Sequence, residues 1–210
     1  MAGRDAIDPV EVVHELQALL SRHRPGDAAE ERSLTRTLQL LRTTGSPFWR
    51  GQCNPGHLTA SAIVVDRARA RTLLVHHETL DRWLQPGGHF EPGETQPVEA
   101  AAREVREETG LATTWPGPLP RLLDVDVHPI PARGVEPAHY HYDLRYLLVA
   151  ASDDPQPVAG DGARAVRWVA RGELEELELD PGLRRALRKV WRGSSAAGSA
   201  SGSAAGAAGE

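Results

Sequence analysis

The chain lacks several features that would place it in other protein classes. It has a single cysteine, Cys53, among 210 residues, which excludes an internal disulfide. No apolar run approaches the roughly 18 residues of a membrane-spanning helix, and the first residues lack a secretory signal pattern. The net charge is -5, so basic residues are not in excess. Nucleic-acid-binding domains, by contrast, usually carry a basic stripe. These absences predict a cytoplasmic protein with no membrane span and no dedicated nucleic-acid surface.

The most informative segment is the glycine-rich stretch 87–94, which leads into a predicted helix rich in glutamate. At 3.6 residues per turn, Glu104, Glu107 and Glu108 fall on one narrow face of that helix. Apolar side chains gather on the neighbouring face, where a core would lie: Val98, Ala101, Ala102 and Val105. A compact cluster of carboxylates on a packed helix is what a hard divalent cation such as Mg2+ requires. The glycine loop beside it indicates a phosphate substrate.

The same glutamates are also compatible with an ordinary surface helix. Like charges at i, i+4 on an exposed helix cost only about 0.2–0.5 kcal/mol, and Arg103 can pair with Glu99 or Glu107. Three glutamates alone therefore do not identify a metal site. The glycines and the arginine around the glutamates favour a metal site over an ordinary surface helix.

The whole string resembles the signature of the Nudix hydrolases: a glycine, five residues, a glutamate, seven residues, then Arg-Glu-aliphatic-x-Glu-Glu-x-Gly-aliphatic. The matching positions are Gly88, Glu94, Arg103, Glu104, Val105, Glu107, Glu108, Gly110 and Leu111. One departure is that eight residues separate Glu94 from Arg103, where the signature has seven. Because Pro97 suits a first helical turn, the extra residue is most easily absorbed at 95–96, before the helix.

The resemblance implies metal-dependent hydrolysis of a pyrophosphate bond in a nucleoside diphosphate linked to another group. Glu104, Glu107 and Glu108 would hold Mg2+ or Mn2+ beside a backbone carbonyl from Gly87 or Gly88, with Glu94 and Arg103 as a supporting pair. At about 5 Å and an effective dielectric near 20, each pair of these charges would repel by roughly 3 kcal/mol, so bridging cations are expected. By family analogy Glu104 is the first choice for the general base. The late segment 160–168, where many relatives carry a further acid, offers only Asp161.

The order of the predicted elements is typical of the α/β/α sandwich with a mixed β-sheet that the Nudix family adopts. We expect a helical pair in an N-terminal extension, residues 1–55, the Nudix domain over residues 56–192, and a disordered Gly/Ala/Ser tail over residues 193–210. The added helices are compatible with a homodimer. The expected strands are 58–65, 72–76, 122–128, 138–149 and 167–169, and the closing helices are 173–177 and 181–191.

Histidines and one arginine are candidates for contact with the substrate. Strand alternation puts His139, His141, Asp143 and Arg145 on one face of the predicted strand 138–149. That row could contact phosphate, or it could be the solvent face of an outer strand. His89, directly after Gly88, could reach a phosphate or face water. A zinc site formed by His128, His139 and His141 is conceivable, although the glutamates favour Mg2+ or Mn2+.

Two other functions can be weighed against a hydrolase acting on a small nucleotide. An isomerase of the isopentenyl diphosphate type needs a reactive cysteine beside the site, and Cys53 lies before the first predicted strand. A non-catalytic, ligand-sensing Nudix domain usually has a degenerate signature, whereas all three glutamates are kept here. The intact set favours the hydrolase. The loops outside the signature, which select the substrate, leave the nucleotide open.

Overall fold

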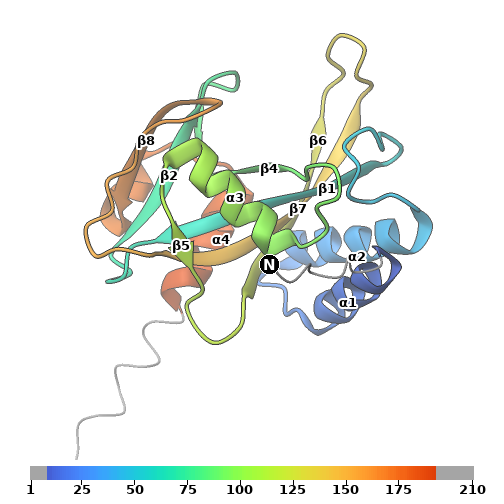
Figure 1. Cartoon of the computed structure of the whole chain (residues 1–210), viewed down its shortest axis with the longest axis horizontal. Helices are drawn as coiled ribbons and strands as arrows, with labels where there is room; N and C mark the ends of the chain where they lie inside the picture. The colour runs from blue at the N-terminus through green and yellow to red at the C-terminus, as the bar shows by residue number, and fades with distance from the viewer. Residues whose placement is uncertain (1–8, 193–210) are drawn as a thin grey trace, which may run out of the picture.

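The centre of the molecule is an eight-stranded mixed β-sheet, which the computed structural model describes together with its helices over residues 9–192 (Figure 1). The strands pair in the order β3-β2-β1-β7-β5, with β4 added on β1, β6 on β7 and β8 on β2. β1 and β7 run parallel, and the other pairs are antiparallel. The strands are β1 Gly56–Val65, β2 Arg71–His77, β3 Arg82–Leu84, β4 Gly87–His89, β5 Thr113–Thr114, β6 Arg121–Ile130, β7 His139–Ala150 and β8 Ala163–Ala170.

β1 lies in the middle of the sheet and is buried along its whole length. Its side chains alternate between two cores: Leu58 and Ala60 belong to one, and Ile63 and Val65 to the other. A strand buried on both faces needs apolar side chains in both directions, which fits the apolar run at 62–65. In the first half of the strand, one face instead carries the buried polar residues His57, Thr59 and Ser61.

Helices cover both faces of the sheet. α3, Pro97–Thr109, packs Val105 into the first core, and α4, Pro181–Arg192, packs Leu183 into the second. Figure 1 shows α3 in front of the sheet and α4 behind it. The predicted α/β/α arrangement with a mixed sheet is confirmed.

Two N-terminal helices, α1 (Pro9–Arg22) and α2 (Ala28–Thr43), pack side by side at one end of the sheet (Figure 1). Asp27 is the N-cap of α2, and its side chain accepts a hydrogen bond from the Glu30 amide at 2.9 Å, as a capping residue should. Leu20 and Leu40 are buried in the same core as α3. The helical pair is therefore joined to the sheet through a shared core.

A buried carboxylate also ties α2 to the rest of the fold. Glu30 is 0% exposed, and its oxygens lie 2.6 Å from His23 Nε2 and 3.2 Å from the Val125 amide of β6. They also pair with Lys189 of α4. One side chain thus contacts two elements that are distant in the sequence, β6 and α4, as well as the turn between α1 and α2.

Four local features differ from the sequence prediction. The segment predicted as a helix at 173–177 is a 3-10 helix, Arg171–Glu176. The short strands β3, β4 and β5 were not predicted, and β4 lies within the glycine loop. The predicted tail, 193–210, lies outside the described residues. Within residues 9–192 no helix combines the length and apolar character needed to cross a membrane.

Candidate active site

The helix that carries the three glutamates begins after the extra residue of the signature. Gln96 is its N-cap and Pro97 its first residue, so the extra residue lies before the helix, as predicted. Gly110 ends the helix with φ 69°, and its amide donates to the Arg106 carbonyl at 2.9 Å. A left-handed residue at this position is a common helix stop that favours glycine. The i, i+3, i+4 spacing of the glutamates is therefore preserved.

Two of the three carboxylates lie against the glycine turn of β4. Glu108 Oε2 accepts a hydrogen bond from the Gly87 amide at 3.1 Å. A Cβ atom on Gly88 would lie 2.6 Å from Glu104 Oε1, so the Glu104 carboxylate fills the space that a side chain would need. The third carboxylate, Glu107, is more open, with 43% of its side chain exposed.

The electrostatics of this face suit a bound cation. Burial, helped by the nearby Glu104 and Glu107 and opposed by the hydrogen bond from the Gly87 amide, raises the pKa of Glu108 from 4.5 to about 8. Burial also raises the pKa of Glu104. Ionised carboxylates in such surroundings lack sufficient positive charge. A hard divalent cation would supply it, and oxygen ligands are the ones it prefers.

Arg103 holds the loop and the helix together. Its Nη2 donates to the His89 carbonyl at 2.8 Å and to Glu94 Oε2 at 3.0 Å. Its Nη1 lies 3.1 Å from Glu104 Oε1 and 2.7 Å from Glu107 Oε2. The predicted contact between Glu94 and Arg103 is thus present despite the extra residue between them. The same guanidinium positions two of the proposed metal ligands.

The histidines lie on the other face of β4 from the glutamates. Because side chains alternate along a strand, Gly88 faces Glu104 of α3, and His89 points to the opposite side. There, His89 Nε2 lies 3.2 Å from His141 Nε2 of β7. His57 of β1 and His139 complete this cluster, with ring centroids 5.0 Å apart. His57, which was not among the predicted site residues, pairs directly with His141 in the β1–β7 register.

Arg145 occupies a different environment from the histidines of its strand. It is 2% exposed, and its guanidinium lies 2.9 Å from Asp143 and 3.3 Å from Asp126. The predicted substrate contact of Arg145 does not match this placement, because carboxylates and α4 cover the side chain. The alternation of side chains along the strand correctly predicted the face of the sheet on which Arg145 lies. It could not predict which residues cover that face.

Asp161, the acid of the late segment, is exposed in the turn before β8. The preceding residue, Gly160, donates its amide to the Glu108 carbonyl at 2.9 Å. This turn therefore lies against the C-terminal end of α3. Asp161 stays a candidate acid near the carboxylate face.

Comparison with known proteins agrees with the sequence signature. The NUDIX domain family model matches residues 55–190. An 8-oxo-(d)GTP phosphatase of Mycolicibacterium smegmatis is 36% identical over 91 residues, 43% of this chain and 25% of that protein. The m7GpppN-mRNA hydrolase NUDT17 of Xenopus laevis is 39% identical over 77 residues, 35% of this chain and 24% of that protein. The match thus spans about a quarter of the length of these relatives.

Solved structures share the fold at low sequence identity. A C. elegans Ap4A hydrolase has a TM-score of 0.52 and 18% identity, covering 66% of this chain and 98% of that chain. The NUDIX domain of Shewanella oneidensis NrtR, solved with ADP ribose, has a TM-score of 0.51 and 14% identity, covering 74% and 97%. Sequence identities this low show only that the fold is shared. The NUDIX family model, by contrast, matches most of the sequence. The chain belongs to the Nudix hydrolase family.

Proposed function

We propose that this protein uses a divalent metal ion to hydrolyse a pyrophosphate bond in a nucleoside diphosphate linked to another group. The observation that carries the proposal is the convergence of half-buried carboxylates on a glycine turn. Glu108 accepts a hydrogen bond from the Gly87 amide, and Glu104 fills the side-chain space of Gly88. Because these positions are glycines, the carboxylates can lie directly against the backbone, and a cation held by them would attract a phosphate chain to the turn.

Each residue of the site has a proposed part in the reaction. Glu104, Glu107 and Glu108 would hold Mg2+ or Mn2+, which when bound neutralises phosphate charge and lowers the pKa of the attacking water. By family analogy, Glu104 would take the proton from that water. Arg103 positions Glu104 and Glu107 through its Nη1.

The reaction adds one water across one bond. The water oxygen forms a new bond to phosphorus, and the bond from that phosphorus to the bridging oxygen breaks. The products are a nucleoside monophosphate and the phosphorylated remainder of the substrate. The proton held by Glu104 is then released to solvent or to a product.

Removal of the metal tests this proposal. Desalting into buffer free of divalent cations should reduce hydrolysis to background, because Mg2+ is held through few protein ligands and exchanges readily. Added Mg2+ should restore the rate with saturable dependence on its concentration. The measurement is the initial rate of product formation against Mg2+ concentration. A rate that does not respond to added Mg2+ or Mn2+ would contradict the metal assignment.

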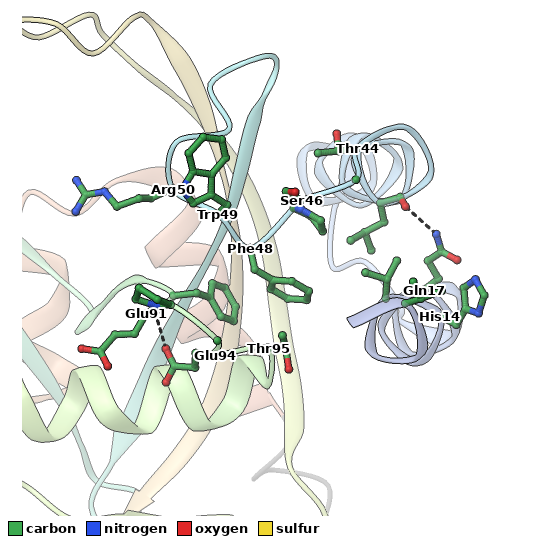
Figure 2. Close-up of a pocket in the computed structure, with 18 of the residues that line it drawn as sticks. His14, Gln17, Thr44, Ser46, Phe48, Trp49, Arg50, Glu91, Glu94 and Thr95 are labelled. Atoms are coloured by element: carbon green, nitrogen blue, oxygen red, sulfur yellow. Dashed lines mark hydrogen bonds between the residues drawn. The ribbon is translucent and has the colours of Figure 1, made fainter. Parts of the chain in front are cut away.

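A large cavity next to the loop could hold the rest of the substrate. It has a volume of about 980 Å3 and lies between α1, the segment after α2 and the loop 90–95. Figure 2 shows Phe48 pointing from that segment toward the loop at Glu94 and Thr95. Phe48 meets Phe90 edge to face, with ring centroids 5.0 Å apart. These two aromatic rings give the cavity an apolar wall. Glu94, the partner of Arg103, also lines the cavity.

Two further side chains of the cavity suit a nucleotide. Trp49 is 62% exposed although it is large and aromatic, and it could stack on a base. Arg50, the next residue, also lines the cavity, and guanidinium groups bind phosphate well. Both curated relatives are named for nucleotide substrates, 8-oxo-(d)GTP and m7GpppN-mRNA. We therefore propose a nucleotide with its base at Trp49.

Replacement of Trp49 tests this position of the base. Loss of base stacking costs about 1–3 kcal/mol, so Trp49→Ala should raise KM by roughly 10-fold to 100-fold. Trp49→Phe keeps an aromatic face and should stay close to the original KM. The rate kcat should change little, because Trp49 is outside the carboxylate cluster. Equal KM values for Trp49→Ala and the unaltered chain would place the base elsewhere.

A further inference from the structure

A cluster of histidines fills the face of the sheet opposite the glutamate helix. His57 of β1, His89 of β4 and His141 of β7 can each offer one ligand atom, and these atoms all lie within 4.8 Å of one another. The ring centroids of His57 and His141 are 4.9 Å apart, and those of His89 and His141 are 4.8 Å apart. Three strands thus bring three imidazoles to one point.

His57 presents a free lone pair to this point. Its Nδ1 lies 3.0 Å from the Gln52 carbonyl oxygen, which can only accept a hydrogen bond, so Nδ1 carries the proton and Nε2 does not. The side chain is fully buried, and Nε2 has no hydrogen-bond partner among the described residues. Buried polar atoms without partners are uncommon. Imidazoles that bind metals are typically oriented in this way by a backbone carbonyl.

The other two histidines have the spacing of ligands. Two nitrogens bound at about 2.1 Å to a tetrahedral zinc ion are about 3.4 Å apart, and His89 Nε2 lies 3.2 Å from His141 Nε2. Both side chains are partly enclosed by the three strands, so the nitrogens face each other on this face of the sheet.

We propose that His57, His89 and His141 form a three-histidine site for a zinc-class divalent transition-metal ion, distinct from the carboxylate site. Imidazole nitrogen suits such ions, whereas Mg2+ prefers oxygen. Three protein ligands leave a fourth position for water or a substrate group.

The proposed ion would also hold the strand that supports the active site. His89 follows Gly88 directly, and its carbonyl accepts a hydrogen bond from Arg103 at 2.8 Å. Joining β4 to β1 and β7 through the ion would restrict the movement of the glycine turn. The two sites would then lie on opposite faces of one strand.

A second group of ligand-type side chains lies nearby but is less enclosed. Cys53, Glu136 and His139 also have ligand atoms within 4.8 Å of one another. Cys53 and Glu136 lie outside the named strands, and 38% of the Glu136 side chain is exposed. Variants of this second group are therefore controls for the location of the ion.

Direct metal binding by the full chain, produced without a histidine tag, tests the proposal. The metal content of the purified protein is measured by elemental mass spectrometry. Zinc is then titrated in excess Mg2+ against a chromogenic chelator. We expect one zinc per chain. Loss of an outer-shell partner weakens metal affinity by about 10-fold to 100-fold, so His141→Gln, which removes a direct ligand, should weaken it at least about 100-fold.

Matched variants show whether zinc binds at the three histidines or elsewhere in the protein. His14→Gln, at an exposed position on α1, and Glu108→Gln, at the carboxylate site, should bind zinc as the unaltered chain does. Cys53→Ser should also bind zinc normally. His89→Gln provides a second ligand variant if His141→Gln does not fold. Failure of the unaltered chain to bind zinc or Co2+ would overturn the proposal. Normal zinc binding by folded His141→Gln or His89→Gln would also overturn it, as would loss of zinc binding in Cys53→Ser.

Discussion

Glu108→Gln is expected to reduce kcat by about 1,000-fold, because a metal-bound transition state loses several kcal/mol when a ligand charge is removed, at 1.36 kcal/mol per factor of ten. The fold should be retained. Glutamine keeps an oxygen that can accept the hydrogen bond from the Gly87 amide, which lies 3.1 Å from Glu108 Oε2. It also removes a charge that burial disfavours. Initial rates at saturating Mg2+ and the Tm in metal-free buffer measure these two effects.

Glu99→Gln is the matched control for this change. Glu99 is on the same helix, in its first turn, and is exposed. Its replacement removes the same charge from α3 and should leave kcat nearly unchanged. A similar loss in both variants would mean that the net charge of the helix matters more than ligand geometry. Normal turnover by Glu108→Gln would contradict the role of this carboxylate.

Glu30→Ala is expected to produce the largest loss of stability. The carboxylate is fully buried and pairs with Lys189, and Arg185 lies 3.9 Å from it. Its removal takes away the acceptor of the Val125 amide and of His23 Nε2, while Lys189 keeps Asp124 as a carboxylate partner. Each buried polar group left unsatisfied costs about 1–3 kcal/mol, and the combined loss lowers the Tm by roughly 10 °C in a domain of this size. Thermal unfolding followed by circular dichroism measures the change. Glu31→Ala, at the next and exposed position of α2, should have little effect.

The Glu30 carboxylate also predicts how the stability of the fold depends on pH. Burial alone would raise the pKa of Glu30, but hydrogen bonds from His23, the Gly26 amide and Lys189 lower it from 4.5 to about 2. A folded-state pKa below the unfolded value gives stability that is present above about pH 4.5 and is lost as the pH falls toward 2. The Tm of the unaltered chain should therefore fall more steeply over this window than that of Glu30→Gln. Parallel curves would show that Glu30 does not act through its charge.

The sequence predicts the carboxylate helix well because its information is local. The spacing of Glu104, Glu107 and Glu108 fixes their face once the segment is helical, and Pro97 and Gly110 mark its ends. The long strands are also local patterns of apolar and β-branched residues. β4 was not predicted because its three residues, two of them glycine, have no strand pattern and form a strand only by pairing with β1.

The histidine cluster and the buried ionic network could not be predicted from local patterns. His57 meets His141 because β1 and β7 pair in parallel, and their register depends on the fold of all the residues between them. Arg145 was correctly placed on the same face as His141 and Asp143, but Asp126 of β6 and α4, which also cover it, come from other segments. Alternation along a strand specifies a face, whereas the partners on that face are set by tertiary packing.

The central claim is that this protein hydrolyses a pyrophosphate bond at its carboxylate face. The most direct test is product analysis by mass spectrometry after incubation with Mg2+ and a panel of nucleoside diphosphate derivatives in 18O-labelled water. We predict two phosphate-bearing products, with the label on one phosphate only, and formation of the same products about 1,000-fold more slowly by Glu108→Gln. No cleavage of any compound, together with thermal stabilisation by one of them, would contradict the hydrolase and favour a ligand-sensing Nudix domain.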